Sequence, residues 1–591
     1  MTATALATKR EFSVADEFHY NQSDPVRWII SHLLRYKIFL VSFFVASTTT
    51  GILFSAIPSL TGQAFDEVLR PETDPRRLLN LSLALLAVVV LRGVVDLINA
   101  FSVETLGQRM ERDARQELYI NLLGKSQTFH NRQRVGDIMA RAANDVRQLN
   151  PMMNPGAGLI LDSFMSLIMP LIFIAFIRVE LLISPVVFIA IFAVALRHYT
   201  RQLNPVAGKM RWQFGMMNAG LAETVTGIEV VKSTAQEAQE KRKFARNAAL
   251  YRDFFVEQGQ IQARYIPLFF LGIAMTTAFA HGLYLYTQGQ LTIGDLVAYM
   301  GLMGILRFPA FISIFTFMLV QLGIAGADRM LSLMKEETDL DENVTGFRSQ
   351  IRGEIIFENV SFSYGEASVL KNITFRAEPG QTIALVGQTG SGKSTLTALV
   401  NRSYDVTEGR ILIDGVDVRD WNLDALRSQI SIIEQNVFLF SRPIRENIAF
   451  GLGQDTDQAA IEQAAHDAQA HDFIMGFKDG YDTVVGERGV TLSGGQRQRI
   501  AIARALLTDP RILILDDSTS AIDSATEDRI QRAINRILEG RTTLLITHRL
   551  SQIRRADKIL VLKQGEIVDQ GNHEALMERS ELYRRIFARY D

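Results

Sequence analysis

Long apolar segments alternate with charged segments over the first 323 residues of the chain. Each apolar segment approaches or exceeds the roughly 20 residues that a helix needs to cross a bilayer. The segments are 38–62, 79–103, 156–177, 179–196, 266–287 and 293–323. The pattern predicts a membrane domain of six transmembrane helices.

The charged segments between these spans keep helical periodicity. QRMERDARQELYINLLGK and AETVTGIEVVKSTAQEAQEKRKF show apolar positions at helical spacing among many charges. We therefore expect spans two to five to continue as helices well beyond the membrane. DPVRWIISHLLRYK (24–37) is also amphipathic, and it predicts a helix that lies at the membrane interface or packs on protein.

Basic residues indicate how the spans are oriented. The segment between spans two and three holds eight Lys and Arg, and the segment between spans four and five holds eleven. The loops at the other ends of the spans hold few, and TQGQLTIGD holds none. By the positive-inside rule, both termini and the long loops face the cytoplasm, and the protein is an integral protein of the cytoplasmic membrane.

The composition of the sequence changes near residue 340, where the apolar spans end. MKEETDLDENVTGFRSQIRG is charged and rich in turn formers, and from Glu354 onward short strands alternate with amphipathic helices. This half predicts an α/β domain. The expected organisation is a tail and interfacial helix at 1–36, a transmembrane domain at 37–335, a linker at 336–352 and the α/β domain at 353–591.

Composition excludes several functions. The chain has no cysteine, which excludes disulfides, thiol catalysis and Cys-ligated zinc. Its net charge of −2 shows no basic bias, so no nucleic-acid partner is expected. Met1 to Asp24 is polar and carries acids, which argues against a cleavable signal peptide.

A phosphate-binding loop lies near the start of the α/β half. TIALVGQTGSGKST has a buried strand, then G-x-x-x-x-G-K-S from Gly387 to Ser394, then the start of a helix. Glycines let backbone N–H groups turn toward phosphates, and the helix N-terminus favours negative charge. The expected phosphate-binding residues are Gly387, Gln388, Thr389, Gly390, Ser391, Gly392, Lys393, Ser394 and Thr395.

ILILDDSTS (512–520) reads as a buried strand that delivers two acids at its carboxyl end. In P-loop enzymes the acid at this position holds the Mg²⁺ shell, and Asp516 suits that task. Lys393 is expected to pair with the β- and γ-phosphates, and Ser394 to ligate Mg²⁺. ATP and Mg²⁺ are therefore the expected cofactors.

LSGGQ (492–496) lies between these two elements, and here the sequence resembles the ATP-binding cassette (ABC) transporters. IIEQNVFLF, VGERG, SAID and ITHRL, named in chain order, also match the family. The resemblance covers nearly the whole chain and implies an exporter-type half-transporter that dimerises. It implies adenine stacking by Tyr364, roles in catalysis for Asp517, His548 and Gln435, a Mg²⁺ contact from Gln435, and a D-loop contributing Ser520 and Asp523.

The resemblance also explains why two chains are needed. In the family, the signature residues of one chain close over the γ-phosphate held by another, at a helix N-terminus that binds anions. Here these residues are Leu492, Ser493, Gly494, Gly495 and Gln496. Each site would use Lys393 of one chain and Ser493 of the other.

Asp517 departs from the family pattern, in which glutamate usually follows the Walker B aspartate and polarises the attacking water. Aspartate is shorter by one methylene, about 1.5 Å, and a displacement of about 1 Å can cost on the order of 10²-fold in rate. The favoured interpretation is the degenerate-site chain of a heterodimer. The alternative is a homodimer in which the shorter acid still positions water.

Two cytoplasmic tips resemble the coupling helices of exporters. One lies at 130–146 and includes Gly136 and Asp137, the other is expected near 210–218, and Glu487 of VGERG is expected to take part in coupling. Arg307, near the middle of span six, is costly to place in lipid. It is a candidate for the substrate cavity, with an ion pair to Asp162 as the alternative.

The favoured function is ATP-driven export or flipping of amphipathic, lipidic or drug-like small molecules, in contact with membrane lipids. An importer with the same fold and an ATP-gated channel or regulatory subunit remain alternatives.

Overall fold

The protein is described by a computed structural model that covers residues 9–14, 17–264, 267–453, 455–486, 489–517 and 524–587. Only the backbone is described for residues 267–268, 313–314, 517, 524–528 and 586–587. The chain divides into two compact units. A membrane unit contains residues 18–118 and 139–334, and an ATPase unit contains residues 1–17, 119–138 and 335–591.

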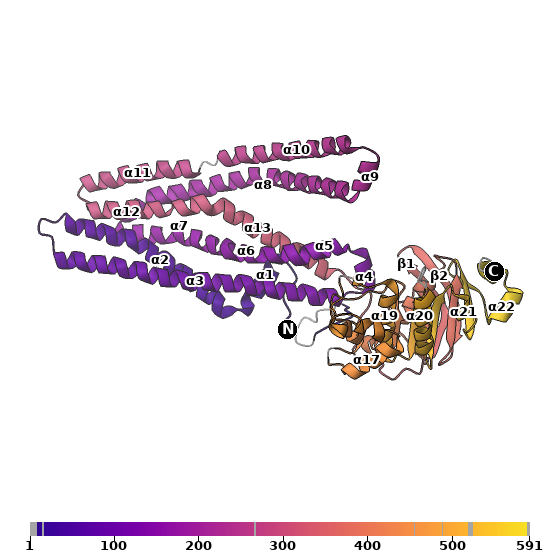
Figure 1. Ribbon diagram of the computed structural model, residues 1–591. Helices are drawn as coiled ribbons and strands as arrows, with labels where there is room; N and C mark the ends of the chain where they lie inside the picture. Colours follow the sequence, from indigo (N-terminus) through magenta and orange to yellow (C-terminus); the bar gives the residue numbers. More distant parts are fainter. Residues whose placement is uncertain are drawn as a thin grey trace. The chain divides into compact units, whose positions relative to one another are not determined.

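The membrane unit is built from long helices (Figure 1). Its helices are α1 (Pro25–Arg35), α2 (Lys37–Val68), α3 (Pro75–Leu123), α5 (Val135–Ala140), α6 (Leu149–Pro151), α7 (Gly158–Ile177), α8 (Ile183–Thr226), α9 (Ile228–Ser233), α10 (Glu237–Ala263), α11 (Pro267–Thr287), α12 (Ile293–Ile305) and α13 (Arg307–Lys335). Of these, α3, α5 and α13 have residues in both units. Helices α3, α8 and α10 run on through the charged segments, as the periodicity predicted.

Seven stretches of the described chain are long and apolar enough to cross a membrane: 37–68, 75–123, 135–177, 179–226, 269–287, 293–312 and 315–335. The last two begin within the segment predicted as span six, and only residues 313 and 314 lie between them. In the most apolar part of each stretch at most 44% of the residues are buried inside the unit, which leaves apolar side chains to contact lipid. The predicted fold class, a helical membrane domain followed by an α/β domain, is confirmed.

Helix α1 packs one face on α3. Trp28 is fully buried and donates its indole N–H to Glu117 Oε2 at 2.9 Å, and His32 beside it is also fully buried. Ile30 and Leu34, on other positions of the helix, stay about half exposed. The amphipathic segment 24–37 thus has one side packed on protein and another side whose apolar residues stay exposed.

The prediction of a second cytoplasmic tip near 210–218 is wrong. Those residues lie inside α8, which continues to Thr226 and ends at Gly227. The turn comes later, through α9 and residues 234–236, and leads into α10, which packs along α8 (Figure 1). Residues 210–218 lack a proline, and nothing in them stops a helix.

The ATPase unit contains two sheets. A four-stranded antiparallel sheet has the order β2-β1-β4-β5, and a six-stranded sheet has the order β10-β9-β3-β8-β7-β6. The strands are β1 (Ile355–Tyr364), β2 (Ala367–Ala377), β3 (Thr382–Gly387), β4 (Glu408–Ile413), β5 (Val416–Asp417), β6 (Ile430–Ile433), β7 (Ile512–Asp517), β8 (Thr542–Thr547), β9 (Lys558–Lys563) and β10 (Glu566–Gly571).

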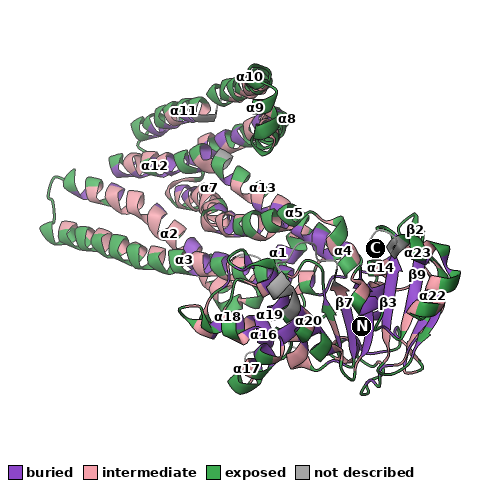
Figure 2. Ribbon diagram, turned by 45° about the vertical axis from the view of Figure 1, so that its right-hand side comes forward, coloured by how far each residue is buried: buried purple, intermediate pink, exposed green. Residues whose placement is uncertain are grey.

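The helices of this unit are α4 (Gln127–Arg132), α14 (Lys393–Val400), α15 (Leu423–Arg427), α16 (Ile444–Ile448), α17 (Gln458–Asp467), α18 (His471–Met475), α19 (Gly494–Thr508), α20 (Ser524–Leu538), α21 (Leu550–Ile553), α22 (His573–Arg579) and α23 (Glu581–Phe587). Strands β3, β6, β7, β8 and β9 are parallel, and β3, β7 and β9 are largely buried (Figure 2). Parallel strands bring their carboxyl ends to one edge, where such sheets bind ligands.

Candidate nucleotide site

The phosphate loop joins the end of β3 to the start of α14. Gly390 and Gly392 have φ of +80° and +99°, values that favour glycine. A Cβ at Gly387 would lie 2.3 Å from Leu562 O, so the loop passes too close to β9 for a side chain. The loop therefore presents backbone to its ligand, with Gln388, Thr389 and Gly390 exposed and Ser391 and Gly392 buried.

Lys393 turns back over this loop. Its Nζ donates to Gly387 O at 2.9 Å and to Gln388 O at 3.1 Å. Burial lowers the pKa of the Lys393 ammonium, against the opposing attraction of Asp516. The Ser391 hydroxyl in the same loop is buried without a hydrogen-bond partner. A phosphate group in this loop would give the Lys393 ammonium a negative charge to pair with, and it would accept a hydrogen bond from the Ser391 hydroxyl.

The predicted Mg²⁺ ligands meet at the end of β7. Ser394 Oγ donates to Asp516 Oδ2 at 3.0 Å, so the hydroxyl at the start of α14 and the carboxylate at the strand end face each other. Both offer oxygen atoms, which Mg²⁺ prefers. Thr395, the next residue of α14, is half-buried. The donor set fits a magnesium ion bound together with a nucleotide.

The remaining predicted catalytic residues lie at the same edge of the sheet. The Asp517 backbone pairs with Thr547, which directly precedes His548 at the end of β8. Gln435 lies two residues beyond the end of β6, the strand next to β7. His548 and Gln435 are exposed, so both side chains are open to a ligand. The Asp517 side chain is not among the described parts of the chain.

Tyr364 ends β1 and belongs to an aromatic cluster. Its ring lies 4.8 Å from Phe362 and 5.2 Å from Tyr404, both in edge-on contacts, and it remains 44% exposed. Neighbouring rings fix its orientation while one face stays open, as stacking on adenine requires. Tyr404 was not among the predicted residues, since no motif marks it.

Tyr404 also links this cluster to α4. Asn131 Nδ2 donates to the Tyr404 hydroxyl at 2.7 Å, and burial raises the pKa of that phenol. Gly136 and Asp137 follow in α5 and are exposed. The link at Asn131 thus comes from the predicted coupling segment but not from the two residues singled out in it.

The signature residues form the start of a 15-residue helix, α19. Ser493 is its N-cap, with its hydroxyl accepting from Gln496 N at 3.3 Å and its N–H donating to Gln496 Oε1 at 2.9 Å. Leu492 and Gly495 are buried, whereas Ser493 and Gly494 are exposed. The helix N-terminus therefore faces outward with its N–H donors, suited to an anion.

Several predicted residues fall outside the described chain. Glu487, Ser520 and Asp523 are among them. Within the described chain, no contact joins Ser493 to the phosphate loop. The signature and the phosphate loop are thus two separate sites within the described chain.

A cavity of about 810 Å³ lies within the membrane unit. Arg307 lines it together with Phe308 and Phe311, as do residues from α2, α3 and α7. The charged lining residues are Arg92, Asp96, Asp162 and Arg307. This placement agrees with the cavity alternative for Arg307.

The charged residues of this cavity differ in whether they lie near an opposite charge. Arg92 Nε lies 3.5 Å from Asp96 Oδ2, and its guanidinium lies 4.2 Å from the centre of the Phe54 ring. Thr50 donates to Asp96 at 2.7 Å. No ion pair of Arg307, with Asp162 or another acid, occurs among the described side chains. Arg92 and Asp96 thus form an ion pair without a hydrogen bond from Arg92 Nε, while Arg307 lines the cavity with its charge.

Two family models match the chain. Residues 370–520 match the model described as ABC transporter, and residues 39–310 match the model described as ABC transporter transmembrane region. The two matches cover the two halves distinguished by hydropathy.

Curated relatives and solved structures agree with these matches. The ATP-dependent lipid A-core flippase of Syntrophus aciditrophicus is 35% identical, over 94% of this chain and 92% of its own length. A putative multidrug export ATP-binding/permease protein, YgaD of Bacillus subtilis, is 33% identical over 84% of this chain and 87% of its own. A solved structure of a bacterial Atm1-family ABC exporter with ATP bound superposes with a TM-score of 0.80 and 29% identity, over 94% of this chain and 98% of that one.

Proposed function

Since this chain belongs to the ABC transporters, we propose that it is an exporter of amphipathic, lipidic or drug-like small molecules and works as half of a dimer. The family and the exporter fold carry ATP hydrolysis coupled to transport. ATP closes the cassettes, and its higher affinity for the closed state shifts the membrane domain from inward- to outward-facing.

We propose a role for each predicted residue of the nucleotide site that the structure describes. Lys393 and the backbone of 387–392 bind the β- and γ-phosphates, and Tyr364 stacks on adenine. Ser394, Asp516 and Gln435 would hold Mg²⁺, which neutralises phosphate charge when bound. The hydrogen bond of 3.0 Å between Ser394 and Asp516 supports this assignment, because it brings two oxygen ligands together. His548 contacts the γ-phosphate, and Ser493 completes the site of a second chain.

We propose further that this chain is the degenerate-site member of a heterodimer. The observation that carries the proposal is Asp517, whose backbone is fixed in a parallel ladder beside Thr547. A carboxylate on a rigid strand end cannot recover a reach shorter by about 1.5 Å. The chain's own site would then hold ATP for a long time, while its signature serves a partner that carries glutamate.

A homodimer in which Asp517 still positions water is the competing arrangement. Native co-purification separates the two. With an affinity tag on this chain, the heterodimer predicts a second, different ABC half-transporter in equal copy number. Recovery of this chain alone, at two copies per complex, would support the homodimer.

The membrane cavity supports an amphipathic substrate. It combines the aromatic rings of Phe308 and Phe311 with the open charge of Arg307. Arg307 would bind an acidic head group while the rings contact an apolar part. The relatives named for lipid A-core flipping and multidrug export fit this chemistry.

Direction and placement rest on charge. The lysine- and arginine-rich loops and the ATPase unit are proposed to face the cytoplasm, in the cytoplasmic membrane. Inside-out vesicles with ATP added outside test the direction. Uptake of a fluorescent short-chain phospholipid into the lumen or lumenal leaflet supports export. ATP-driven movement the other way would indicate import, and single-channel currents would indicate a pore.

A further inference from the structure

The described amino-terminal segment, residues 9–14, lies between two other segments of the ATPase unit; we call it the N-terminal strap. The Glu11 N–H donates to Gly124 O at 2.8 Å, and the Glu342 N–H donates to Arg10 O at 2.7 Å. A Cβ on Gly124 would lie 2.8 Å from Phe12 O. Glycine at 124 therefore allows a backbone approach that any other residue would obstruct.

The two flanking segments also bind each other. The Ser126 N–H donates to Thr338 Oγ1 at 2.8 Å, and Lys125 Nζ donates to Glu336 O. The strap adds a hydroxyl bond from Ser13 to Glu342 Oε2 at 2.8 Å. The strap, the loop before α4 and the segment after α13 thus form one hydrogen-bonded layer.

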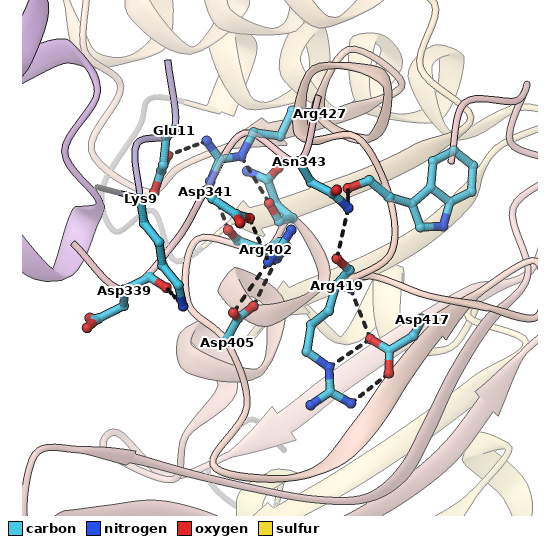
Figure 3. Close-up of polar contacts among 12 residues, drawn as sticks. Lys9, Glu11, Asp339, Asp341, Asn343, Arg402, Asp405, Asp417, Arg419 and Arg427 are labelled. Carbon is cyan, nitrogen blue, oxygen red and sulfur yellow. Dashed lines mark hydrogen bonds and ion pairs between the residues drawn. The ribbon is translucent and has the colours of Figure 1, made fainter. Parts of the chain in front are cut away.

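One strap side chain reaches from this layer to Arg427, which binds the chain just after α14. Glu11 Oε2 accepts from Arg427 Nη1 at 2.6 Å, and the Glu11 side chain is only 11% exposed (Figure 3). Arg427 in turn donates to Asn401 O at 3.3 Å and Arg402 O at 2.8 Å. These two carbonyls directly follow the last residue of α14, the helix whose first residue is Lys393.

Arg402, which supplies the second of these carbonyls, is itself held by two acids. Arg402, 5% exposed, pairs with Asp405 at 2.9 Å and lies 3.8 Å from Asp341, in the segment that binds the strap (Figure 3). Helix carbonyl ends carry partial negative charge, which a fixed cation stabilises. The Arg427 guanidinium, oriented by Glu11, therefore stabilises the end of α14, and the ion pairs of Arg402 fix the segment that follows this helix.

We propose that Glu11 is a positioning residue of the nucleotide site, acting through Arg427 on α14. It orients the guanidinium on the two carbonyls and so fixes the helix whose other end binds phosphate. ATP binding at the start of α14 and ordering of the strap then favour each other, since coupling between two sites is reciprocal. This role is the same whether the second chain of the dimer is identical or different.

ATP affinity tests the role. Glu11→Gln keeps the shape and the hydrogen bond but removes the charge, and charge-assisted bonds are about twice as strong as neutral ones. In intact protein in nanodiscs, we expect the dissociation constant of fluorescent MANT-ATP with Mg²⁺ to rise about three- to fivefold, with kcat for ATP within about twofold of wild type. Ser13→Ala, which removes a strap contact that does not reach Arg427, is the matched control and is expected to leave both values unchanged.

A double variant tests whether Glu11 acts through Arg427. Arg427→Lys keeps the charge and loses the fork that spans the carboxylate and the carbonyls. If the two residues act in series, Glu11→Gln with Arg427→Lys is no weaker for ATP than the weaker single variant. Hydrogen exchange supplies a second readout: MgATP is expected to slow exchange at the Glu11 and Glu342 amides in wild type but not in Glu11→Gln.

Three outcomes would overturn the proposal. They are wild-type ATP affinity in Glu11→Gln, equal loss of affinity in Glu11→Gln and Ser13→Ala, and fully additive effects in the double variant. Equal loss would indicate that the strap only stabilises the unit as a whole. Additive effects would show that Glu11 and Arg427 affect ATP affinity independently of each other.

Discussion

Replacing Asp517 by glutamate is the sharpest perturbation of the hydrolytic site. The strand end that carries this residue is held in a parallel ladder, with Asp516 opposite Ile546 and Asp517 opposite Thr547. On its other side, β7 pairs with β6 as far as Leu515. The backbone therefore cannot advance to compensate for a short side chain. Only a longer side chain restores the reach.

The expected gain follows from that distance. One additional C–C bond extends the carboxylate by about 1.5 Å, and a misplacement of about 1 Å costs on the order of 10²-fold in rate. Two powers of ten correspond to about 2.7 kcal/mol of activation free energy. Asp517→Glu is therefore expected to raise the ATP turnover at this site by about 10- to 100-fold. The affinity for ATP is expected to change little.

Steady-state phosphate release at saturating MgATP measures the gain, on the transporter purified with whatever chain it assembles with. Where a different second chain co-purifies, the comparison uses a Ser493→Ala background, which silences the partner's site. Asp517→Asn is the matched control, since it keeps the length and removes the charge. Equal rates for Asp517→Glu and wild type would show that reach is not what limits this site.

Three further predictions concern other parts of the chain. Tyr364→Ala is expected to weaken MANT-ATP binding by about 3- to 10-fold, since aromatic stacking contributes about 0.5–1.5 kcal/mol, whereas Tyr364→Phe binds as wild type; equal loss in both would refute stacking. Arg307→Gln is expected to raise the half-saturating concentration for transport of a fluorescent short-chain phosphatidic acid at least about tenfold, without changing basal ATP turnover. Arg307→Lys, which keeps the positive charge, is expected to recover part of the lost affinity. Unchanged transport would exclude Arg307 from the substrate site. Burial, with the nearby Arg10 charge, lowers the pKa of Lys125 to about 8, so acetic anhydride should label it half-maximally near pH 8, and Arg10→Gln should move that midpoint upward; a midpoint near that of free lysine would refute the buried placement.

The sequence predicted those features that local patterns determine. Apolar runs gave the spans, and the glycine loop, the strand ending in Asp516 and the signature helix all lie where the motifs predicted. These features depend on residues close together in the chain. Motif spacing therefore predicted the loop, the strand end and the start of the signature helix before any packing was known.

Features that depend on distant residues were not predicted. The second tip was placed near 210–218 instead of at α9, because α8 continues past its internal Pro205 and ends only at Gly227, so its breakers do not mark where it ends. The contacts of Glu11 with Arg427 and of Asn131 with Tyr404 join residues hundreds of positions apart. No periodicity or motif records such pairs, so they emerge only from the fold.

The central claim is that fast ATP hydrolysis requires a second, different chain, the partner of the proposed heterodimer. ATP turnover of the chain purified alone, compared with turnover of the complex recovered with its native partner, tests that claim most directly. The account predicts slow turnover for the chain alone and fast turnover for the complex, which Ser493→Ala in this chain abolishes and Asp517→Asn leaves nearly intact. Fast turnover by the chain alone, abolished by Asp517→Asn, would contradict it.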